Sequence, residues 1–450
     1  RLSARPGRRT VTASQSKPGK KTPWTATMRH MLLLLPLLLA AACEGSERRR
    51  ALPPPSTPPK GGEIMSRNTD DGLRVQPYIS NRRYWQYKGK PVLLLGGSVE
   101  DNLFQIPDIR EHLDLLQSAG GNYVRSTMSS RDEGNVWPFE RNGEGLYDLT
   151  VPSEGYWRRF SRFLELAFER DIIVQIEVWA TFDFYRAPWR DNPFNPKNNV
   201  NYTPEQSGIP VDIPSHPTKH ENPFFWSVPA EHNNETLLRY QRFFVDTMLS
   251  HSLNFGHVTY CMDNETSVTS EWGKYWAEYI RAKARGKGVE VETTEMWDPW
   301  DLAHPWHAFT LQNPQTYTFV EISQNNHQKG ENHWNNMQAH LKRLEAANAV
   351  RPVTNVKIYG NDEGRFGSTR DGQERFWRNI FGGCSSARFH RPISGQGLNE
   401  TAQANIRSLR MLTDEMTWHE CAPRNDLLSE RRENGAYCFA RPGSEYAVYF

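Results

Sequence analysis

Residues 257–265 read HVTYCMDNE, a short apolar run that ends abruptly in Asp263, Asn264 and Glu265. The β-branched and aromatic residues of this run predict a buried strand. Two carboxylates and an amide directly after such a strand indicate that its carboxyl end opens onto a polar crevice.

The chain contains eight runs of this strand-like kind. They begin near Val92, Tyr123, Ile172, His257, Val289, Tyr317, Thr354 and Ala387. Five of the seven intervals between their starts measure 28 to 37 residues, and amphipathic helical segments fill most of the gaps. One strand and one helix repeated eight times predict an α/β fold, the (β/α)8 TIM barrel. An open doubly wound sheet is the alternative, but no GxGxxG motif follows the first run.

Polar residues follow the carboxyl ends of these runs, which face one crevice in a barrel. Because the crevice lacks a phosphate loop and a metal triad, we expect no cofactor and no metal there. The long Pro/Asn/Trp-rich insertion 185–234 should cover the same end of the barrel. The candidate site residues are Asp101, Arg125, Glu177, Trp179, Asn264, Glu265, Gln324, Asn325, Tyr359, Asp362, Glu363 and His390.

Composition points to a neutral ligand. The formal net charge is +2, from 54 basic and 52 acidic residues, so no strong field would gather nucleic acid or a membrane surface. The 15 Trp, 17 Tyr and 21 Phe residues are abundant, and many stand in polar loops. Aromatic faces beside amides and carboxylates suit sugar rings, so we expect a carbohydrate substrate. The oligomeric state is left open.

The N-terminal residues predict export rather than fold. Residues 1–27 are basic and resemble readthrough upstream of a start at Met28, and 28–43 have the short apolar core of a signal peptide. The segment ends in LAAAC, which resembles a bacterial lipoprotein processing box with lipidation at Cys43. An ordinary signal peptide is the alternative. Either predicts an extracytoplasmic location, with the Pro-rich residues 44–75 as a linker.

Four cysteines remain besides Cys43, without zinc-binding spacing. Cys421 and Cys438 flank a predicted hairpin and could pair in an oxidising compartment. Cys261 and Cys384 lie in predicted strands and are expected to be buried thiols.

The Asn-Glu pair after the fourth strand and the Arg after the second resemble the large clan of retaining (β/α)8 glycoside hydrolases. More narrowly, the run from Tyr84 to His390 is similar to apiosidase-like barrels, which are secreted bacterial proteins often followed by a β-sandwich named as a collagen-binding domain. The resemblance implies that Glu265 is the general acid/base, that Asn264 bonds the sugar 2-hydroxyl and that Arg125 steadies the nucleophile. We expect Asp263 to help raise the pKa of Glu265.

The seventh strand departs from that clan, because VKIYGNDE places Lys357 where the nucleophilic carboxylate is expected. Glycoside cleavage needs a second carboxylate about 5–5.5 Å away as nucleophile or about 6.5–9.5 Å away as base. Asp362 is our choice, with Glu363 and Glu177 in reserve, and retention or inversion is left open.

The other candidates are assigned to substrate binding. Gln324 and Asn325 would read hydroxyls, Trp179 would stack on a sugar, and Asp101, Tyr359 and His390 would line the crevice. The sequence thus predicts a secreted, lipid-anchored glycoside hydrolase over residues 76–422. Residues 423–450 would begin a truncated β-sandwich. An inactive barrel that binds carbohydrate or matrix is the alternative, and collagen proteolysis is disfavoured because no HExxH motif occurs.

Overall fold

The computed structural model describes residues 71–216 and 219–450. The expected readthrough segment, the signal segment with Cys43, and residues 44–70 of the linker lie outside the described residues. Among the helices of the described ranges, none combines the length and the apolar character needed to cross a bilayer.

Eight short parallel strands form the barrel that the sequence predicts. Six of them pair in the order β10-β9-β8-β5-β4-β13, and β11 pairs with β12. Backbone hydrogen bonds join the six-stranded and the two-stranded sheets. Thr318 N donates to Thr293 O and Ser385 N donates to Val353 O, each at 2.8 Å. The ring therefore closes. The strands are β4 (Leu94–Gly97), β5 (Tyr123–Thr127), β8 (Ile173–Trp179), β9 (Val258–Asp263), β10 (Thr293–Thr294), β11 (Val320–Glu321), β12 (Val353–Thr354) and β13 (Ser386–Phe389).

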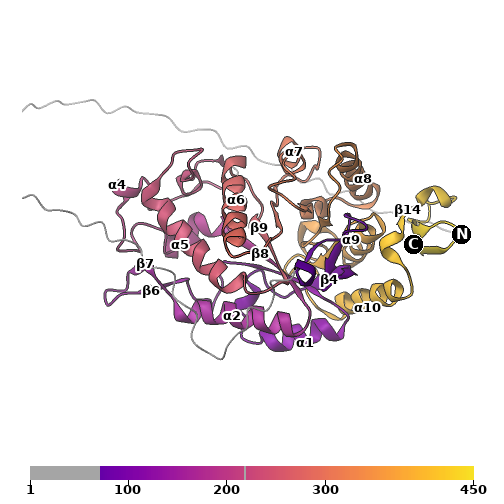
Figure 1. Ribbon diagram of the computed structural model, residues 1–450, viewed down its shortest axis with the longest axis horizontal. Helices are drawn as coiled ribbons and strands as arrows, with labels where there is room; N and C mark the ends of the chain where they lie inside the picture. Colours follow the sequence, from indigo (N-terminus) through magenta and orange to yellow (C-terminus); the bar gives the residue numbers. More distant parts are fainter. Residues whose placement is uncertain (1–70, 217–218) are drawn as a thin grey trace, which may run out of the picture. The chain divides into compact units, whose positions relative to one another are not determined.

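Helices follow the strands around the outside of the ring (Figure 1). In α2 the predicted period holds, since Trp157, Phe160, Phe163 and Leu164 are all buried in the core. The larger helices are α1 (Ile109–Ser118), α2 (Glu154–Glu169), α5 (Glu235–Ser252), α6 (Ser270–Gly286), α7 (Pro305–Gln312), α8 (Gly330–Ala346), α9 (Thr369–Phe381) and α10 (Glu400–Asp414).

The first predicted strand proves to be two elements. Lys90–Val92 is β3, which pairs antiparallel with β2 (Trp85–Tyr87), itself paired with β1 (Gln76–Pro77). The barrel strand β4 starts only at Leu94. A Cβ on Gly96 would lie 1.8 Å from the Tyr123 carbonyl oxygen, so only glycine lets β4 approach β5 this closely.

The region after β8 folds over the barrel as a compact cap. It contains α3 (Arg186–Asp191) and α4 (Pro204–Ser207), while β6 (Phe139–Arg141) and β7 (Tyr147–Pro152) form a neighbouring hairpin. Phe184 and Phe224 of the cap stack with ring centroids 4.1 Å apart. The aromatic residues of this insertion therefore serve mainly to build a core.

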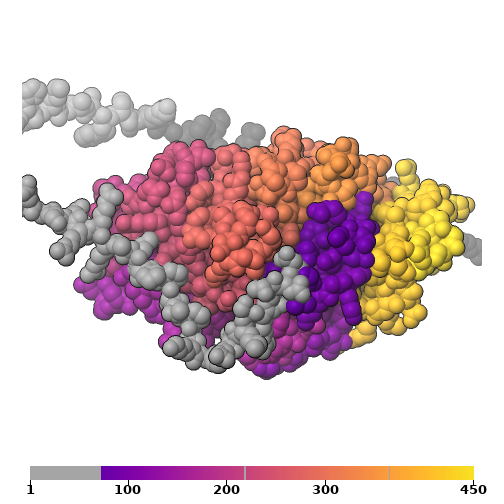
Figure 2. All heavy atoms as spheres, in the orientation of Figure 1, coloured from indigo at the N-terminus to yellow at the C-terminus, as the bar shows by residue number. Residues whose placement is uncertain are grey.

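The C-terminal residues form a three-stranded antiparallel sheet of β14 (Ala422–Pro423), β15 (Tyr437–Arg441) and β16 (Glu445–Tyr449). The predicted hairpin thus has a third strand, and it packs on the barrel helices, with the Trp377 and Tyr449 rings stacked at 5.3 Å. The predicted boundary at 422/423 falls inside β14. On the surface this region adjoins the first residues described, where Asn81 Nδ2 donates to His419 O at 2.7 Å (Figure 2).

The cysteines of the described residues are all free and buried. Pairing of Cys421 with Cys438 is therefore wrong. In the β14–β15 register Ala422 faces Ala440 and Pro423 faces Phe439, so Cys421 and Cys438 stand at different levels of the ladder and on opposite faces. The burial predicted for Cys261 and Cys384 is confirmed.

Candidate active site

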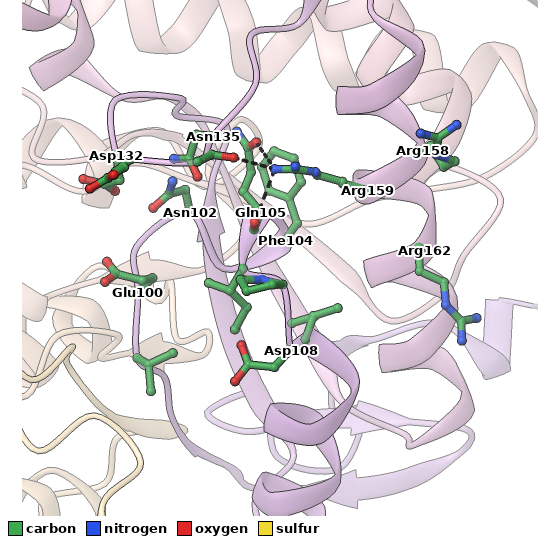
Figure 3. Close-up of a pocket in the computed structure, with 16 residues that line it drawn as sticks. Glu100, Asn102, Phe104, Gln105, Asp108, Asp132, Asn135, Arg158, Arg159 and Arg162 are labelled. Atoms are coloured by element: carbon green, nitrogen blue, oxygen red, sulfur yellow. Dashed lines mark hydrogen bonds between the residues drawn. The ribbon is translucent and has the colours of Figure 1, made fainter.

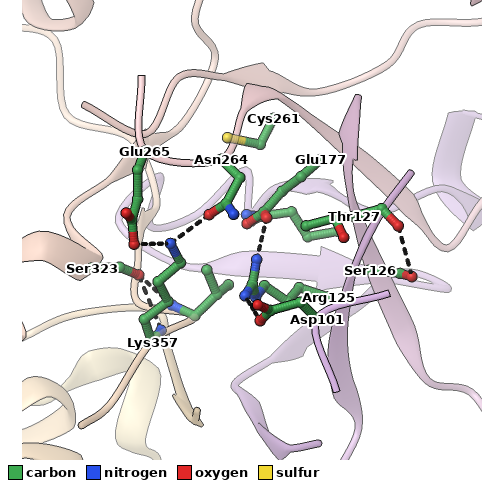
Figure 4. A network of polar contacts seen from close by, with 12 residues as sticks. Asp101, Arg125, Ser126, Thr127, Glu177, Cys261, Asn264, Glu265, Ser323 and Lys357 are labelled. Carbon is green, nitrogen blue, oxygen red and sulfur yellow. Dashed lines mark hydrogen bonds and ion pairs between the residues drawn. The ribbon is translucent and has the colours of Figure 1, made fainter. Parts of the chain in front are cut away.

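The strand ends bring two ionic clusters together at the mouth of the barrel (Figure 4). In one, Lys357 lies between Asn264 and Glu265. In the other, Arg125 lies between Asp101 and Glu177. Each cluster joins residues that are far apart in sequence, as expected where parallel strands end at one edge.

The Lys357 cluster is the more accessible of the two. Lys357 Nζ donates to Glu265 Oε1 at 2.6 Å and to Asn264 Oδ1, and the lysine side chain is 1% exposed against 21% for the glutamate. Lys357 follows β12, and the Ile358–Phe389 bridge next to it continues this strand along β13. The lysine therefore does occupy the seventh-strand position that the sequence singled out.

The backbone and the charges around Glu265 fix its carboxylate. Its φ of +61° is in the left-handed region, which a non-glycine residue adopts at a cost. Burial alone would raise the pKa of Glu265, but the Lys357 charge and hydrogen bond outweigh burial and lower it. Gln324 lowers this pKa further, although neither end of its amide makes a well-oriented hydrogen bond. Tyr359 completes the group, donating from its hydroxyl to Glu265 Oε1 at 3.5 Å.

This electrostatic environment corrects one prediction. The pKa of Glu265 is lowered rather than raised, and Asp263 is not among the groups that shift it. The Asp263 carboxylate accepts a hydrogen bond from Trp272 Nε1 of α6 at 3.0 Å. Burial, followed by the charge of Glu295, raises the pKa of Asp263 itself. Because its own pKa is lowered, Glu265 is ionised at neutral pH.

The Arg125 cluster forms the floor of the site. Arg125 is fully buried and donates to both Asp101 and Glu177. Burial raises the pKa of Glu177 despite Arg125, whereas for Asp101 the arginine and the neighbouring His390 and Arg391 outweigh burial and lower it. Arg125 and Glu177 therefore hold the floor together beneath the ligand space.

A cavity of about 460 Å³ opens above these clusters. Its size falls in the range of ligand pockets, about 300–1,000 Å³. Of the predicted residues, Asp101, Asn264, Glu265 and His390 line it together with Lys357. The cap contributes the other wall, from Phe182 to Pro188, and Arg131 and Arg391 close the rim.

Four predicted site residues lie elsewhere. Asp362 and Glu363 are exposed, and the Asp362 carboxylate accepts hydrogen bonds from Thr369 N and Oγ1, at 2.9 and 2.5 Å, where α9 begins. This N-terminal capping interaction turns Asp362 away from the crevice. Trp179 is 1% exposed among cap and helix aromatics, such as Trp276 at 5.2 Å, and offers no face to a sugar. Asn325 is used structurally, donating to His333 O at 3.0 Å.

Two further residues that the sequence reasoning missed lie in the loop after β10, next to the site but outside the lining of the 460 Å³ cavity. Asp298 N donates to Thr266 O at 3.0 Å, which sets Asp298 beside the segment that carries Glu265. Burial, and then the Glu265 charge, raises the pKa of Asp298 to about 6. Trp300 is 47% exposed, with its ring stacked 4.3 Å from His327 and the Arg365 guanidinium 5.9 Å from the ring centre. Their signal was the motif MWDPW, directly after the fifth strand.

No group of three His, Cys, Asp or Glu side chains suited to a metal ion is found within residues 71–216 and 219–450. Most charged residues that line the cleft are ion-paired, such as Lys357 with Glu265 and Arg391 with Asp101.

Lys357→Met should destabilise the protein by about 3 kcal/mol at neutral pH, because it leaves the Glu265 carboxylate buried without its cation. Without Lys357, burial raises the pKa of Glu265 above its unfolded value, so the deficit should shrink as pH falls and the group takes up a proton. Urea unfolding of the wild type and of Lys357→Met at pH 7.5 and pH 4.5 measures the loss of unfolding free energy at each pH. Lys329→Met, which removes a half-exposed pair with Asp371, is the control and should cost at most about 1 kcal/mol. A deficit independent of pH would contradict the role given to the Lys357 charge.

Comparison with known proteins defines the fold class. No protein-family model matches the chain, and no curated protein does. Solved structures that share the fold are glycoside hydrolases of the (β/α)8 type. The chain therefore has the (β/α)8 TIM-barrel fold that these hydrolases share.

Two of these structures show the extent of the likeness. One is a glycoside hydrolase family 5 mannosidase from Rhizomucor miehei in complex with mannosyl-fructose, 10% identical, with a TM-score of 0.52 over 76% of this chain and 97% of that chain. The other is a family 5 glycoside hydrolase from Bacteroides vulgatus, 12% identical, with a TM-score of 0.51 over 82% of this chain and 79% of that one. At such identity the likeness concerns the fold.

Proposed function

We propose that the protein hydrolyses a glycosidic bond, with Glu265 and Asp298 as its two working carboxyl groups. The observation that carries the proposal is their opposite electrostatic setting. The pKa of Glu265 is lowered by Lys357, while that of Asp298 is raised to about 6 by burial and by Glu265 itself. Enzymes that cleave glycosides by acid/base catalysis use two carboxyl groups with different pKa values, one protonated and one ionised.

The roles follow from those charges. Asp298 retains its proton to higher pH and is the proton donor to the leaving oxygen. Glu265, ionised beside Lys357, is the carboxylate that acts as nucleophile or as base toward water. This reverses the sequence-based assignment, in which Glu265 was the acid. Asn264 and Tyr359 would orient the sugar and the carboxylate.

The lysine at the seventh-strand position fits this arrangement. A second carboxylate there would repel Glu265, whereas Lys357 keeps it ionised and fixed by a 2.6 Å contact. The partner carboxyl comes instead from the loop after β10. Lys357 is thus a positioning residue.

A glycoside library tests the proposal. It should include mannosides, because of the family 5 mannosidase similarity, and apiosides, because of the resemblance to apiosidase-like barrels. The wild-type chain should release sugar from at least one member. Glycan binding without product from any member would instead support the alternative of an inactive carbohydrate- or matrix-binding barrel.

The pH dependence of hydrolysis should have an alkaline limb near pH 6, because Asp298 must be protonated to donate and its pKa is raised to about 6. As pH rises through that value, kcat/KM should fall about tenfold per unit. Asp298→Asn should lower activity and abolish this limb. A limb that persists in Asp298→Asn would assign the donor to another group.

We also propose that the protein is exported and anchored at Cys43 through lipid, as the LAAAC motif predicts. Expressed in a bacterium fed labelled palmitate, the full chain should become labelled and partition into detergent. Cys43→Ser should abolish the label. Unchanged labelling would exclude this anchor.

A further inference from the structure

The protein has a second and larger cavity, of about 840 Å³, whose lining residues are shown in Figure 3. Its walls are the loop after β4, the loop after β5 and one face of α2. The same short segment serves both cavities, since Asp101 lines the cleft while its neighbours Glu100 and Asn102 line the second cavity. Arg391 of the cleft rim donates to Glu100 Oε2 at 3.4 Å, so an ion pair connects the linings of the two spaces.

The second cavity contains polar groups that are buried yet lack partners. Asn102 is 2% exposed, and its Oδ1 accepts no hydrogen bond. Asn135 Nδ2 and Asp132 Oδ2, which line the same cavity, are also buried without partners. An amide oxygen, an amide nitrogen and a carboxylate offer both acceptors and a donor. A ligand rich in hydroxyl groups carries donors and acceptors that match these side chains.

The rest of the lining selects among such ligands. Val99, Ile106, Pro107 and Ile109, none of them fully buried, form an apolar surface suited to the C–H faces of sugar rings. Four carboxylates and three arginines line the cavity, so it has no positive excess for an anionic glycan. Arg159 is moreover held by the carbonyls of Gln105 and Gly134, the latter at 3.0 Å. The chemistry therefore favours a neutral saccharide.

We propose that this second cavity is a remote subsite, which binds further neutral sugar units of the glycan that is cleaved beside Glu265. The inference rests on the proposed hydrolase function and adds that the natural substrate is an oligosaccharide or polysaccharide. A glycan that crosses the Glu100–Arg391 pair would occupy both spaces at once. Binding energy from the remote units would then favour long substrates over short ones.

The experiment compares chain length with the full-length protein. From the sugar series that the wild type hydrolyses, the disaccharide and the hexasaccharide are tested with Asn135→Ala and Asn102→Ala. Each variant should lower kcat/KM for the hexasaccharide about three- to tenfold, through KM, and leave the disaccharide unchanged. Asn254→Ala, an exposed amide at the end of α5, is the matched control.

The outcomes separate the two proposals. Equal losses on both lengths, or no loss, with folded variants would overturn the subsite while leaving the hydrolase function intact. Asn135 is only half-buried, so its variant keeps the test valid if Asn102→Ala fails to fold. Should no library member be hydrolysed, calorimetric titration with neutral manno-, xylo- and cello-hexaose decides. Tighter binding to the wild type than to Asn135→Ala supports the subsite, and no difference rejects it.

Discussion

Glu265→Gln is expected to lower kcat/KM for a hydrolysed glycoside by about 10²- to 10⁴-fold, the range seen when one acid–base group is removed. The amide keeps the shape of the side chain but carries no negative charge to attack or to activate water. It also loses the ionic contact with Lys357, now 2.6 Å long. Initial rates of sugar release, measured with equal amounts of folded protein, give the loss.

Two comparisons make this result specific to the cleft. Asp362→Asn removes an exposed carboxylate that binds only the start of α9, and it should leave kcat/KM unchanged. Glycan affinity of Glu265→Gln should persist, because the cavity walls from the cap and the Arg391 rim are intact. Wild-type rates in Glu265→Gln would remove Glu265 from the mechanism.

Arg125→Met should have the largest effect on stability, at about 3–5 kcal/mol or more. Arg125 is fully buried and ion-paired to two carboxylates from different strands. Without it, Asp101 still contacts Arg131 at 3.2 Å and Arg391 at 3.1 Å, but Glu177 retains no ion pair. The penalty is therefore that of one buried carboxylate without its cation.

The penalty should depend on pH. Burial raises the pKa of Glu177 even beside Arg125, and loss of the arginine raises it further. A carboxyl group whose pKa is higher in the folded than in the unfolded protein destabilises the folded state as pH rises through that pKa. The loss of unfolding free energy in Arg125→Met should therefore be greater at pH 8 than at pH 5. Urea midpoints at both values measure it. Arg158→Met, which breaks an exposed pair with Glu154, is the control and should stay within about 0.5 kcal/mol. A deficit equal to that of the control would mean that the floor cluster does not stabilise the barrel.

The fold was readable because its signals are local and periodic. Buried runs such as 257–263 and the α2 face repeat at strand and helix periods, whatever the rest of the chain does. Boundaries were less certain, since Lys90–Val92 and Leu94–Gly97 form one apolar run in sequence but lie in different sheets. Asp362 and Glu363, which the sequence suggested as the second carboxylate, lie outside the crevice because the course of a loop is likewise not encoded in a local period. By Asp362, eight residues after the end of β12, the chain has left the crevice, and the Asp362 carboxylate binds the first residue of α9.

The sequence by itself determined the barrel, the polar strand ends and the position of Glu265, because these depend on residue type and spacing along one segment. Tertiary structure alone decided which charges meet. The contact of Lys357 with Glu265 spans 92 residues and that of Arg125 with Glu177 spans 52. A pKa depends on burial and on the distances to other charges. The lowered pKa of Glu265 and the raised pKa of Asp298 are therefore set by the folded barrel and not by the local sequence.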